Sequence, residues 1–205
     1  MDNKAIYIVF TATPYRIGRM IRKVTRESYN HVSIALDEDL TDMYSFARRY
    51  YKTPFYGGFV KESIARYHTK GIASNLHMCR IPVTEQQYTA VAQQLQNMLE
   101  RNEHYLYNHF SAISALFHRQ TQVKDAYICV EFCTRVLQAI GIDIDPNKFY
   151  SVGDLEKLLQ EYSYYTGSMP DTNMYDSEYF SAKPVAHPAI QTARDFFELF
   201  RRLKQ

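Results

Sequence analysis

The chain of 205 residues lacks tryptophan, contains only three cysteines and carries a net charge of just +2. Nucleic-acid-binding proteins usually concentrate a strong basic excess on one face, so this near balance argues against that class. No apolar run approaches the roughly 20 residues that a membrane-spanning helix needs. The first residues lack the basic start of a signal peptide and include Asp2. We therefore predict a cytoplasmic protein, with no transmembrane segment, in which the thiols stay reduced.

The residues that are present are those of an ordinary globular protein. Hydrophobic residues make up 46% of the chain and charged residues 22%, and the length suits one domain with a core and a pocket. The 18 tyrosines and 12 phenylalanines are unusual in number. Tyrosine has an apolar ring and a polar hydroxyl, so this richness predicts half-solvated surfaces, either a binding groove or a subunit contact. The sequence therefore leaves open whether the protein forms a homodimer.

Strand-like and helix-like patterns together predict an α+β fold. The strand-like patterns dominate the first part of the chain. Ala5–Thr11 is β-branched and aromatic, as in a buried strand. Residues 31–36 alternate like a half-buried strand, and residues 43–47 return as its hairpin partner. Residues 48–73 keep no sustained period and predict a long loop with short elements, where binding walls are often found.

Helical patterns dominate the second part. Thr84 and Gln87 match a capping box, and a helical stripe follows to about Arg101. The apolar positions of residues 126–140 also follow helical spacing, and this helix is predicted to end at Gly141.

An amphipathic helix is predicted directly after the first strand, beginning near Pro14 and Tyr15. Its apolar stripe is accompanied by basic residues on the other faces: Arg16, Arg19, Arg22, Lys23 and Arg26. Such a pattern favours a solvated helix surface, with an anion or lipid-headgroup patch as the alternative.

The C-terminal part differs in composition from the rest. Residues 164–188 are rich in Tyr, Asp, Ser and Pro and predict an extended arm, and residues 189–203 form an amphipathic helix. We predict that this helix packs on the body of the protein or on a second subunit. The chain is thus divided into a main domain, residues 1–163, and an arm with a C-terminal helix, residues 164–205, packed on the same domain.

Cys129 is the candidate for chemistry because it lies at the predicted start of a helix. Unpaired backbone N–H groups and the positive end of the helix dipole favour a thiolate there, and the same N–H groups can bind an oxyanion. Cys133 lies one turn further along the apolar face and Cys79 lies within a predicted strand, so both indicate core residues. His31, at the start of a strand, is the candidate base.

The motif NHVSIALD (residues 30–37), followed by YICVEFC (residues 127–133) and a helix ending in Gly-Ile-Asp, resembles a known superfamily. It is similar to the circularly permuted branch of the NlpC-type papain-like cysteine hydrolases, which includes amidase-like proteins and relatives of lecithin retinol acyltransferase. In that branch the strand with the histidine precedes the helix with the cysteine. The resemblance spans about residues 5–160. It implies a papain-like fold in which a small antiparallel sheet packs against the helix that begins at Cys129.

The resemblance also implies roles. Cys129 would be the nucleophile and His31 the base, and the backbone N–H of Cys129 would contribute to the oxyanion hole. A polar residue on the strand after the histidine strand would orient the imidazole; the hairpin register places Ser45 nearest, with Asp37 and Glu62 as alternatives. The implied reaction is hydrolysis or acyl transfer on an amide or ester of a peptide, an acylated amino acid or a lipid-like molecule. No metal or organic cofactor is implied.

Three other interpretations compete with this one. Cys129 and Arg135 match the Cys-x5-Arg spacing of phosphatases, but bulky residues and Glu131 occupy what would be a phosphate-cradling loop. A metal site at Cys129 and Cys133 has no further pair with zinc-like spacing. A catalytically inactive module that binds a lipid or peptide in the same groove is the main alternative, because Ser45 stabilises an imidazolium less than a carboxylate would.

Overall fold

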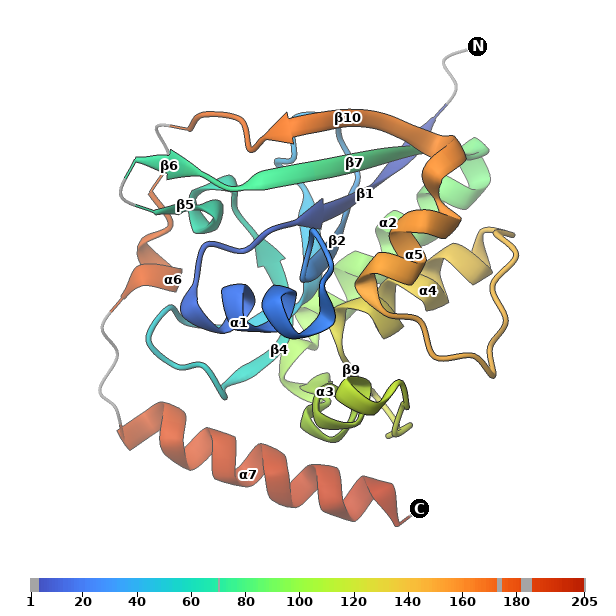
Figure 1. The fold of residues 1–205 in the computed structure, drawn as a ribbon. Helices are drawn as coiled ribbons and strands as arrows, with labels where there is room; N and C mark the ends of the chain where they lie inside the picture. The colour runs from blue at the N-terminus through green and yellow to red at the C-terminus, as the bar shows by residue number, and fades with distance from the viewer. Residues whose placement is uncertain (1–3, 70, 173–174, 182–185, 205) are drawn as a thin grey trace.

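A computed structural model describes residues 4–69, 71–172, 175–181 and 186–204. One sheet dominates the molecule, and its strand order is β10-β7-β1-β2-β3-β4-β8-β9 (Figure 1). The strands are β1 (Ala5–Thr11), β2 (His31–Ala35), β3 (Met43–Arg48), β4 (Gly57–Glu62), β7 (Asn75–Pro82), β8 (Leu106–Tyr107), β9 (Ala126–Tyr127) and β10 (Ser163–Ser168). A separate two-stranded sheet joins β5 (His68–Thr69) and β6 (Ile72–Ala73).

The α+β class predicted from the sequence is confirmed, but the sheet is larger than predicted and is not purely antiparallel. Its short strands β8 and β9 pair in parallel, whereas the other neighbouring strands pair antiparallel. The two-residue strands carry too little pattern to be recognised in the sequence. The sheet is therefore a mixed one with eight strands.

The predicted first strand is present as β1, and every residue of it is buried. Ile6, Ile8 and Phe10 belong to the main core, and Tyr7 and Val9 belong to a second core on the other face. Burial on both faces explains why β1 is a continuous apolar run instead of an alternating one. β1 thus forms the centre of the sheet, between β7 and β2.

The helices are α1 (Arg16–Thr25), α2 (Glu85–Glu100), α3 (His109–Ser114), α4 (Cys129–Ala139), α5 (Val152–Leu158), α6 (Ser177–Phe180) and α7 (Ala186–Leu203). Four short 3-10 helices are η1 (Ile64–Tyr67), η2 (Asn102–His104), η3 (Ala115–Phe117) and η4 (Gln160–Tyr162). α2, α4 and α5 lie together on one side of the sheet and close the main core (Figure 1). The capping box of α2 is confirmed, because the N–H of Gln87 donates to Thr84 Oγ1 at 3.1 Å and the N–H of Thr84 donates to Gln87 Oε1 at 2.8 Å.

The predicted hairpin of β2 and β3 is present, but its pairing is short. Ile34 pairs with Tyr44 and Ala35 with Met43, next to the turn, and no further pair of these two strands follows toward His31 within the described residues. The two strands therefore diverge at the end of the sheet where His31 lies.

Strand β4 lies inside residues 48–73, where the sequence predicted a long loop with short elements but did not place a strand of the main sheet. The glycines that suggested a loop are needed for close packing instead. A Cβ atom at Gly58 would lie 2.8 Å from the carbonyl oxygen of Tyr105, because β8 pairs with β4 at Gly58 and Leu106. Glycine is the residue that allows such an approach of two backbones.

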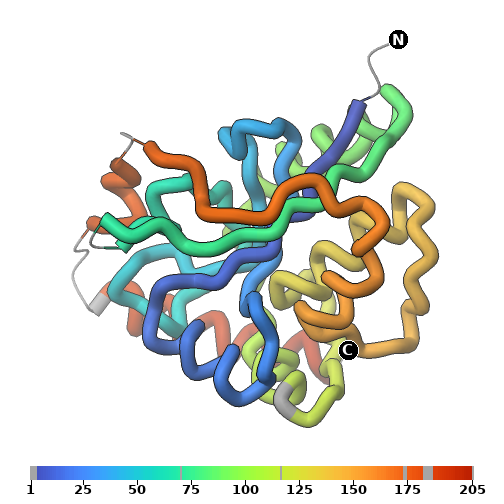
Figure 2. The backbone as a smooth tube through the Cα atoms, turned by 45° about the horizontal axis from the view of Figure 1, so that its top comes forward, coloured from blue at the N-terminus to red at the C-terminus, as the bar shows by residue number. Residues whose placement is uncertain are grey.

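The segment after residue 162 begins with a strand and ends with a helix. β10 runs along β7 as the edge of the sheet (Figure 2). α7 packs on the body through Leu199, which is fully buried against Leu106, Val123 and Ala126. Among the described residues no helix is long and apolar enough to cross a membrane.

Candidate active site

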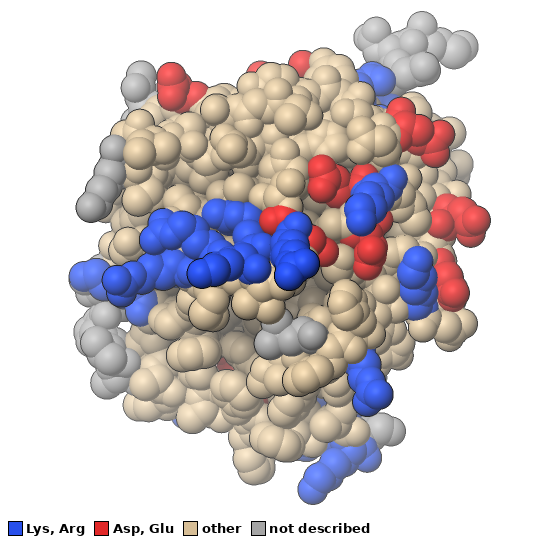
Figure 3. Space-filling view, viewed as in Figure 1, with Lys and Arg blue, Asp and Glu red and all other residues tan. Residues whose placement is uncertain are grey.

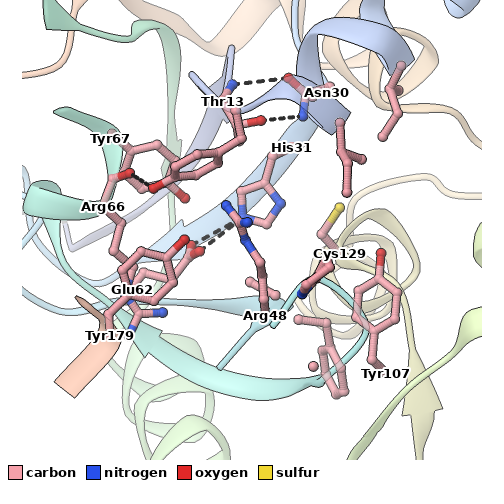
Figure 4. A pocket seen from close by; sticks show the side chains of 18 of the residues that line it. Thr13, Asn30, His31, Arg48, Glu62, Arg66, Tyr67, Tyr107, Cys129 and Tyr179 are labelled. Carbon is pink, nitrogen blue, oxygen red and sulfur yellow. Dashed lines mark hydrogen bonds and ion pairs between the residues drawn. The ribbon is translucent and has the colours of Figure 1, made fainter. Parts of the chain in front are cut away.

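A pocket of about 170 Å3 opens at the end of the strands where β2 begins and β3 ends. His31, Glu62 and Cys129 line it, although they come from β2, β4 and α4 (Figure 4). The divergence of β2 and β3 leaves the end of the sheet open at this point. The two residues that the sequence predicted as nucleophile and base therefore lie in one pocket.

Cys129 is the first residue of α4, so its backbone N–H has no acceptor within the helix. The N–H of Ile128 donates to Glu131 at 2.9 Å, and the Ser111 hydroxyl also donates to Glu131. These bonds hold the start of the helix. Further along α4, Cys133 is fully buried in the main core, as predicted.

The imidazole of His31 is held by a carboxylate. Nε2 of His31 lies 3.2 Å from each carboxylate oxygen of Glu62, and the Ser33 hydroxyl donates to Glu62 Oε2 at 2.5 Å. Cys129 also lies close enough to the imidazole to raise the pKa of His31. Because Nε2 faces Glu62, Nδ1 is the ring nitrogen left for the thiol, and Cys129 lies beside the imidazole on the other side from Glu62 (Figure 4).

Electrostatics in the pocket favour a charged imidazole and a charged carboxylate. Burial disfavours the imidazolium, but the negative charges of Glu62 and Cys129 and their hydrogen bonds outweigh it and raise the pKa of His31 from 6.5 to about 10. Burial likewise disfavours the carboxylate of Glu62. The charge and hydrogen bond of His31, with the nearby charge of Arg66, nevertheless lower the pKa of Glu62 from 4.5 to about 2. The pair is therefore ionised at neutral pH.

Neighbouring side chains fix the position of His31. The ring of Tyr67 lies 6.3 Å from the imidazole centroid at an angle of 28° and is itself buried. The preceding residue, Asn30, donates to Thr13 Oγ1 at 2.8 Å and accepts from the N–H of Thr13 at 3.0 Å. Asn30 thus connects the start of β2 to the segment after β1. The backbone of His31 is held by Asn30, and the face of its imidazole is covered by Tyr67.

The prediction that Ser45 orients His31 does not match the geometry. Ser45 is fully buried opposite Val60, and its hydroxyl has no hydrogen-bond partner among the described residues. Because β2 and β3 diverge, the register of the hairpin does not carry Ser45 to the imidazole, and Glu62 reaches it from the next strand. Asp37, the other alternative, accepts the N–H groups of Thr41 and Asp42 in the hairpin turn.

Tyr107 is a pocket residue that the sequence did not single out. It is the last residue of β8 and pairs in parallel with Tyr127 of β9, and its hydroxyl points toward Cys129 (Figure 4). Burial, followed by the charges of Cys129 and Glu131, raises the pKa of Tyr107. The hydroxyl therefore keeps its proton and can donate it in a hydrogen bond. A two-residue strand offers no pattern from which this position could have been found.

A second cysteine, histidine and glutamate lie together where β7 meets α5. The Sγ of Cys79 lies 3.8 Å from Nε2 of His77, whose Nδ1 lies 3.0 Å from Glu156. However, Cys79 is fully buried, and burial and the charge of Glu156 raise its pKa to about 12. This thiol is neutral and inaccessible, so Cys79 is a core residue, as predicted, and Cys129, which lines the pocket, remains the candidate nucleophile.

No cluster of three histidine, cysteine, aspartate or glutamate side chains that could hold a metal ion occurs within the described part of the chain. No family model matches the chain, and no curated protein or solved structure matches it either. The resemblance seen in residues 30–37 and 127–133 therefore stays an expectation, and the geometry of the pocket has to support any functional proposal.

Proposed function

We propose that the protein is a cysteine hydrolase or acyltransferase with a permuted papain-like fold, acting on an amide or ester of a peptide, an acylated amino acid or a lipid-like molecule. The observation that carries the proposal is the position of the His31 imidazole between the carboxylate of Glu62 and the thiol of Cys129, on the wall of a pocket. A nucleophile, a base and a group that orients the base are the parts that such catalysis requires.

In the first half of the reaction, Nδ1 of His31 holds the proton taken from Cys129, and the thiolate attacks the carbonyl carbon. Glu62 keeps the imidazolium charged and oriented through Nε2. The tetrahedral oxyanion would accept hydrogen bonds from the N–H of Cys129 and the hydroxyl of Tyr107. The C–N or C–O bond then breaks, the leaving group takes the proton from Nδ1, and an acyl-enzyme remains.

In the second half, Nδ1 removes a proton from water or from an acceptor amine or alcohol, which attacks the thioester carbonyl. The C–S bond breaks, and the thiolate of Cys129 re-forms beside the imidazolium. The same nitrogen of His31 thus accepts and returns the proton in both halves, while Glu62 stays bound to Nε2 throughout.

The alternative of an inactive binding module was motivated by Ser45, a poor partner for an imidazolium. Glu62 removes that reason, because a buried carboxylate holds the imidazole at 3.2 Å. A cytoplasmic location is part of the proposal, supported by Cys79, Cys129 and Cys133 all being free thiols.

The pH dependence of iodoacetamide alkylation, mapped to individual cysteines, tests the proposal. We expect Cys129 to react much faster than Cys79 and Cys133 at neutral pH, because only Cys129 is paired with an imidazolium in a pocket. In His31→Ala the rate at Cys129 should fall, because no imidazolium remains beside the thiol. Equal, slow labelling of all three cysteines, or a rate at Cys129 that is indifferent to His31, would exclude the proposed enzyme.

A further inference from the structure

The catalytic pocket continues into a wider groove of about 880 Å3 that runs beside α1. Tyr15, Ile17, Arg48 and Pro54 line both cavities. Four arginines line the groove, namely Arg16, Arg19, Arg22 and Arg48, and no aspartate or glutamate is among its described lining residues. In the space-filling view, basic side chains form a band over α1, directly above a hollow (Figure 3).

The arginines of the groove have no acidic partners. No carboxylate of the described residues lies within ion-pair distance of any of the four guanidinium groups. Arg19 donates to the carbonyl oxygen of Pro14 at 2.8 Å, and Arg22 donates to that of Thr13 at 3.0 Å. Burial and the nearby charge of Arg19 lower the pKa of Arg22. These like charges are held close together without a counter-charge from the protein.

Arg48 connects the groove to the catalytic residues. Its guanidinium carbon lies 3.9 Å from the centroid of the Tyr15 ring, and its Nη1 donates to the carbonyl oxygen of Tyr51 at 3.2 Å. Stacking covers one face of the guanidinium and leaves donors at its edge. Arg66, the other arginine of the pocket, is instead paired with Asp176 at 2.9 Å. Within the part of the chain that the structure describes, Arg48 is therefore a pre-positioned cation of the pocket without an acidic partner.

We propose that the substrate is anionic: the amide or ester carries, in its non-reacting part, a carboxylate or phosphate that binds Arg48 and extends toward the arginines of α1. This inference rests on the proposed function and names the substrate class of the same site. A planar guanidinium binds either anion through paired N–H donors, and charge-assisted bonds of this kind are stronger than neutral ones. Apolar side chains also line the groove, including Ile17 and Ile72, which is 72% exposed. They provide a surface for an apolar part of the same molecule.

Two alkylating reagents of nearly equal size test the role of charge, because iodoacetate is an anion and iodoacetamide is neutral. We expect the ratio of the iodoacetate rate to the iodoacetamide rate at Cys129 to exceed the same ratio for a free thiol such as glutathione. In Arg48→Gln this ratio should fall about ten-fold, as for the loss of one charge-assisted hydrogen bond, and Arg48→Lys should restore part of it. Arg119→Gln removes an equal charge from an exposed residue outside the pocket and should leave the ratio unchanged.

The outcomes separate this inference from the proposed function. If iodoacetamide labels Cys129 quickly but the ratio is that of glutathione and does not respond to Arg48→Gln, the anionic substrate is excluded while the enzyme proposal stands. If neither reagent labels Cys129 selectively, the enzyme proposal fails, and the binding experiment below then decides whether the groove takes anions.

The binding experiment uses Cys129→Ala protein and calorimetric titration with three probes: N-benzoylglycine, its neutral amide N-benzoylglycinamide, and benzyl phosphate. We expect at least one anion to bind about ten-fold more tightly than the neutral amide, with the difference removed by adding Arg48→Gln. The stronger of the two anions identifies carboxylate or phosphate as the group recognised. Equal binding of all three probes, or no binding of either anion, would overturn the inference.

Discussion

Glu62 makes its polar contacts in the interior of the protein, where only 4% of its surface is exposed. Both its oxygens contact His31, and one of them also accepts the hydroxyl of Ser33. A buried ion pair is costly to break from one side, because the remaining charge is left without compensation. Glu62 therefore has two roles: it sets the charge of His31 and it stabilises the interior. Substituting Glu62 and Ser45 one at a time shows which of them acts on His31.

We expect Glu62→Gln to slow alkylation of Cys129 at neutral pH by about ten-fold, because the amide no longer stabilises the imidazolium by a charged hydrogen bond. Ser45→Ala is the matched control: it changes a buried polar side chain in the neighbouring strand that has no hydrogen-bond partner among the described residues. Alkylation kinetics of the two variants at several pH values provide the measurement. A larger effect of Ser45→Ala than of Glu62→Gln would show that the orienting residue has been misassigned.

The sequence singled out Cys129 and His31 directly but named Glu62 only as an alternative to Ser45, and the reason is local. Cys129 and His31 lie at the ends of elements with strong patterns, a helix and a strand. Glu62 lies in a strand that begins with Gly57 and Gly58, and glycine lowers strand propensity. The glycines are present because β8 crosses close to β4, a long-range contact that no local pattern reports.

At the scale of elements, α7 supports the part of the sheet that leads to the nucleophile. Leu199 packs on Ala126 of β9, and Cys129 follows β9 after one residue. The rings of His109 and Phe196 stack with centroids 4.6 Å apart, and His109 also lines the pocket that holds Cys129. A helix distant in sequence thus contacts both the strand that precedes Cys129 and a side chain that lines the pocket.

Leu199→Ala is expected to lower the free energy of unfolding by about 3 kcal/mol, because it leaves a cavity in a fully buried cluster. Phe197→Ala, on the same helix, removes a larger side chain that is 74% exposed and should have little effect. Urea denaturation of both variants measures the difference. Equal losses in the two variants would mean that α7 does not pack on the body through Leu199.

At the scale of the whole molecule, the His31–Glu62 pair makes stability depend on pH. The pKa of His31 is raised from 6.5 to about 10, so its contribution is complete below pH 6.5 and is lost as the pH rises to 10. The pKa of Glu62 is lowered from 4.5 to about 2, so its contribution is complete above pH 4.5 and is lost as the pH falls to 2. The pair therefore stabilises the fold most between pH 4.5 and 6.5.

We expect the free energy of unfolding of the wild type, compared with that of Glu62→Gln, to show its largest advantage in this pH range. The advantage should shrink toward pH 10 and toward pH 2. Chemical denaturation across the pH range measures the difference, and the comparison cancels the titration of groups that the two proteins share. A constant difference at all pH values would show that the two residues are not an ion pair.

The short pairing of β2 with β3 divides the sheet into two blocks that are joined at the hairpin turn. His31 belongs to the block of β10, β7, β1 and β2, whereas Glu62 and Tyr107 belong to the block of β3, β4, β8 and β9. The hairpin turn joins the two blocks at one end, and the contact between His31 and Glu62 joins them at the open end. A ligand that contacts both blocks links them at the open end. We expect such a ligand to slow amide hydrogen exchange in β2 and β3, the strands that border the opening.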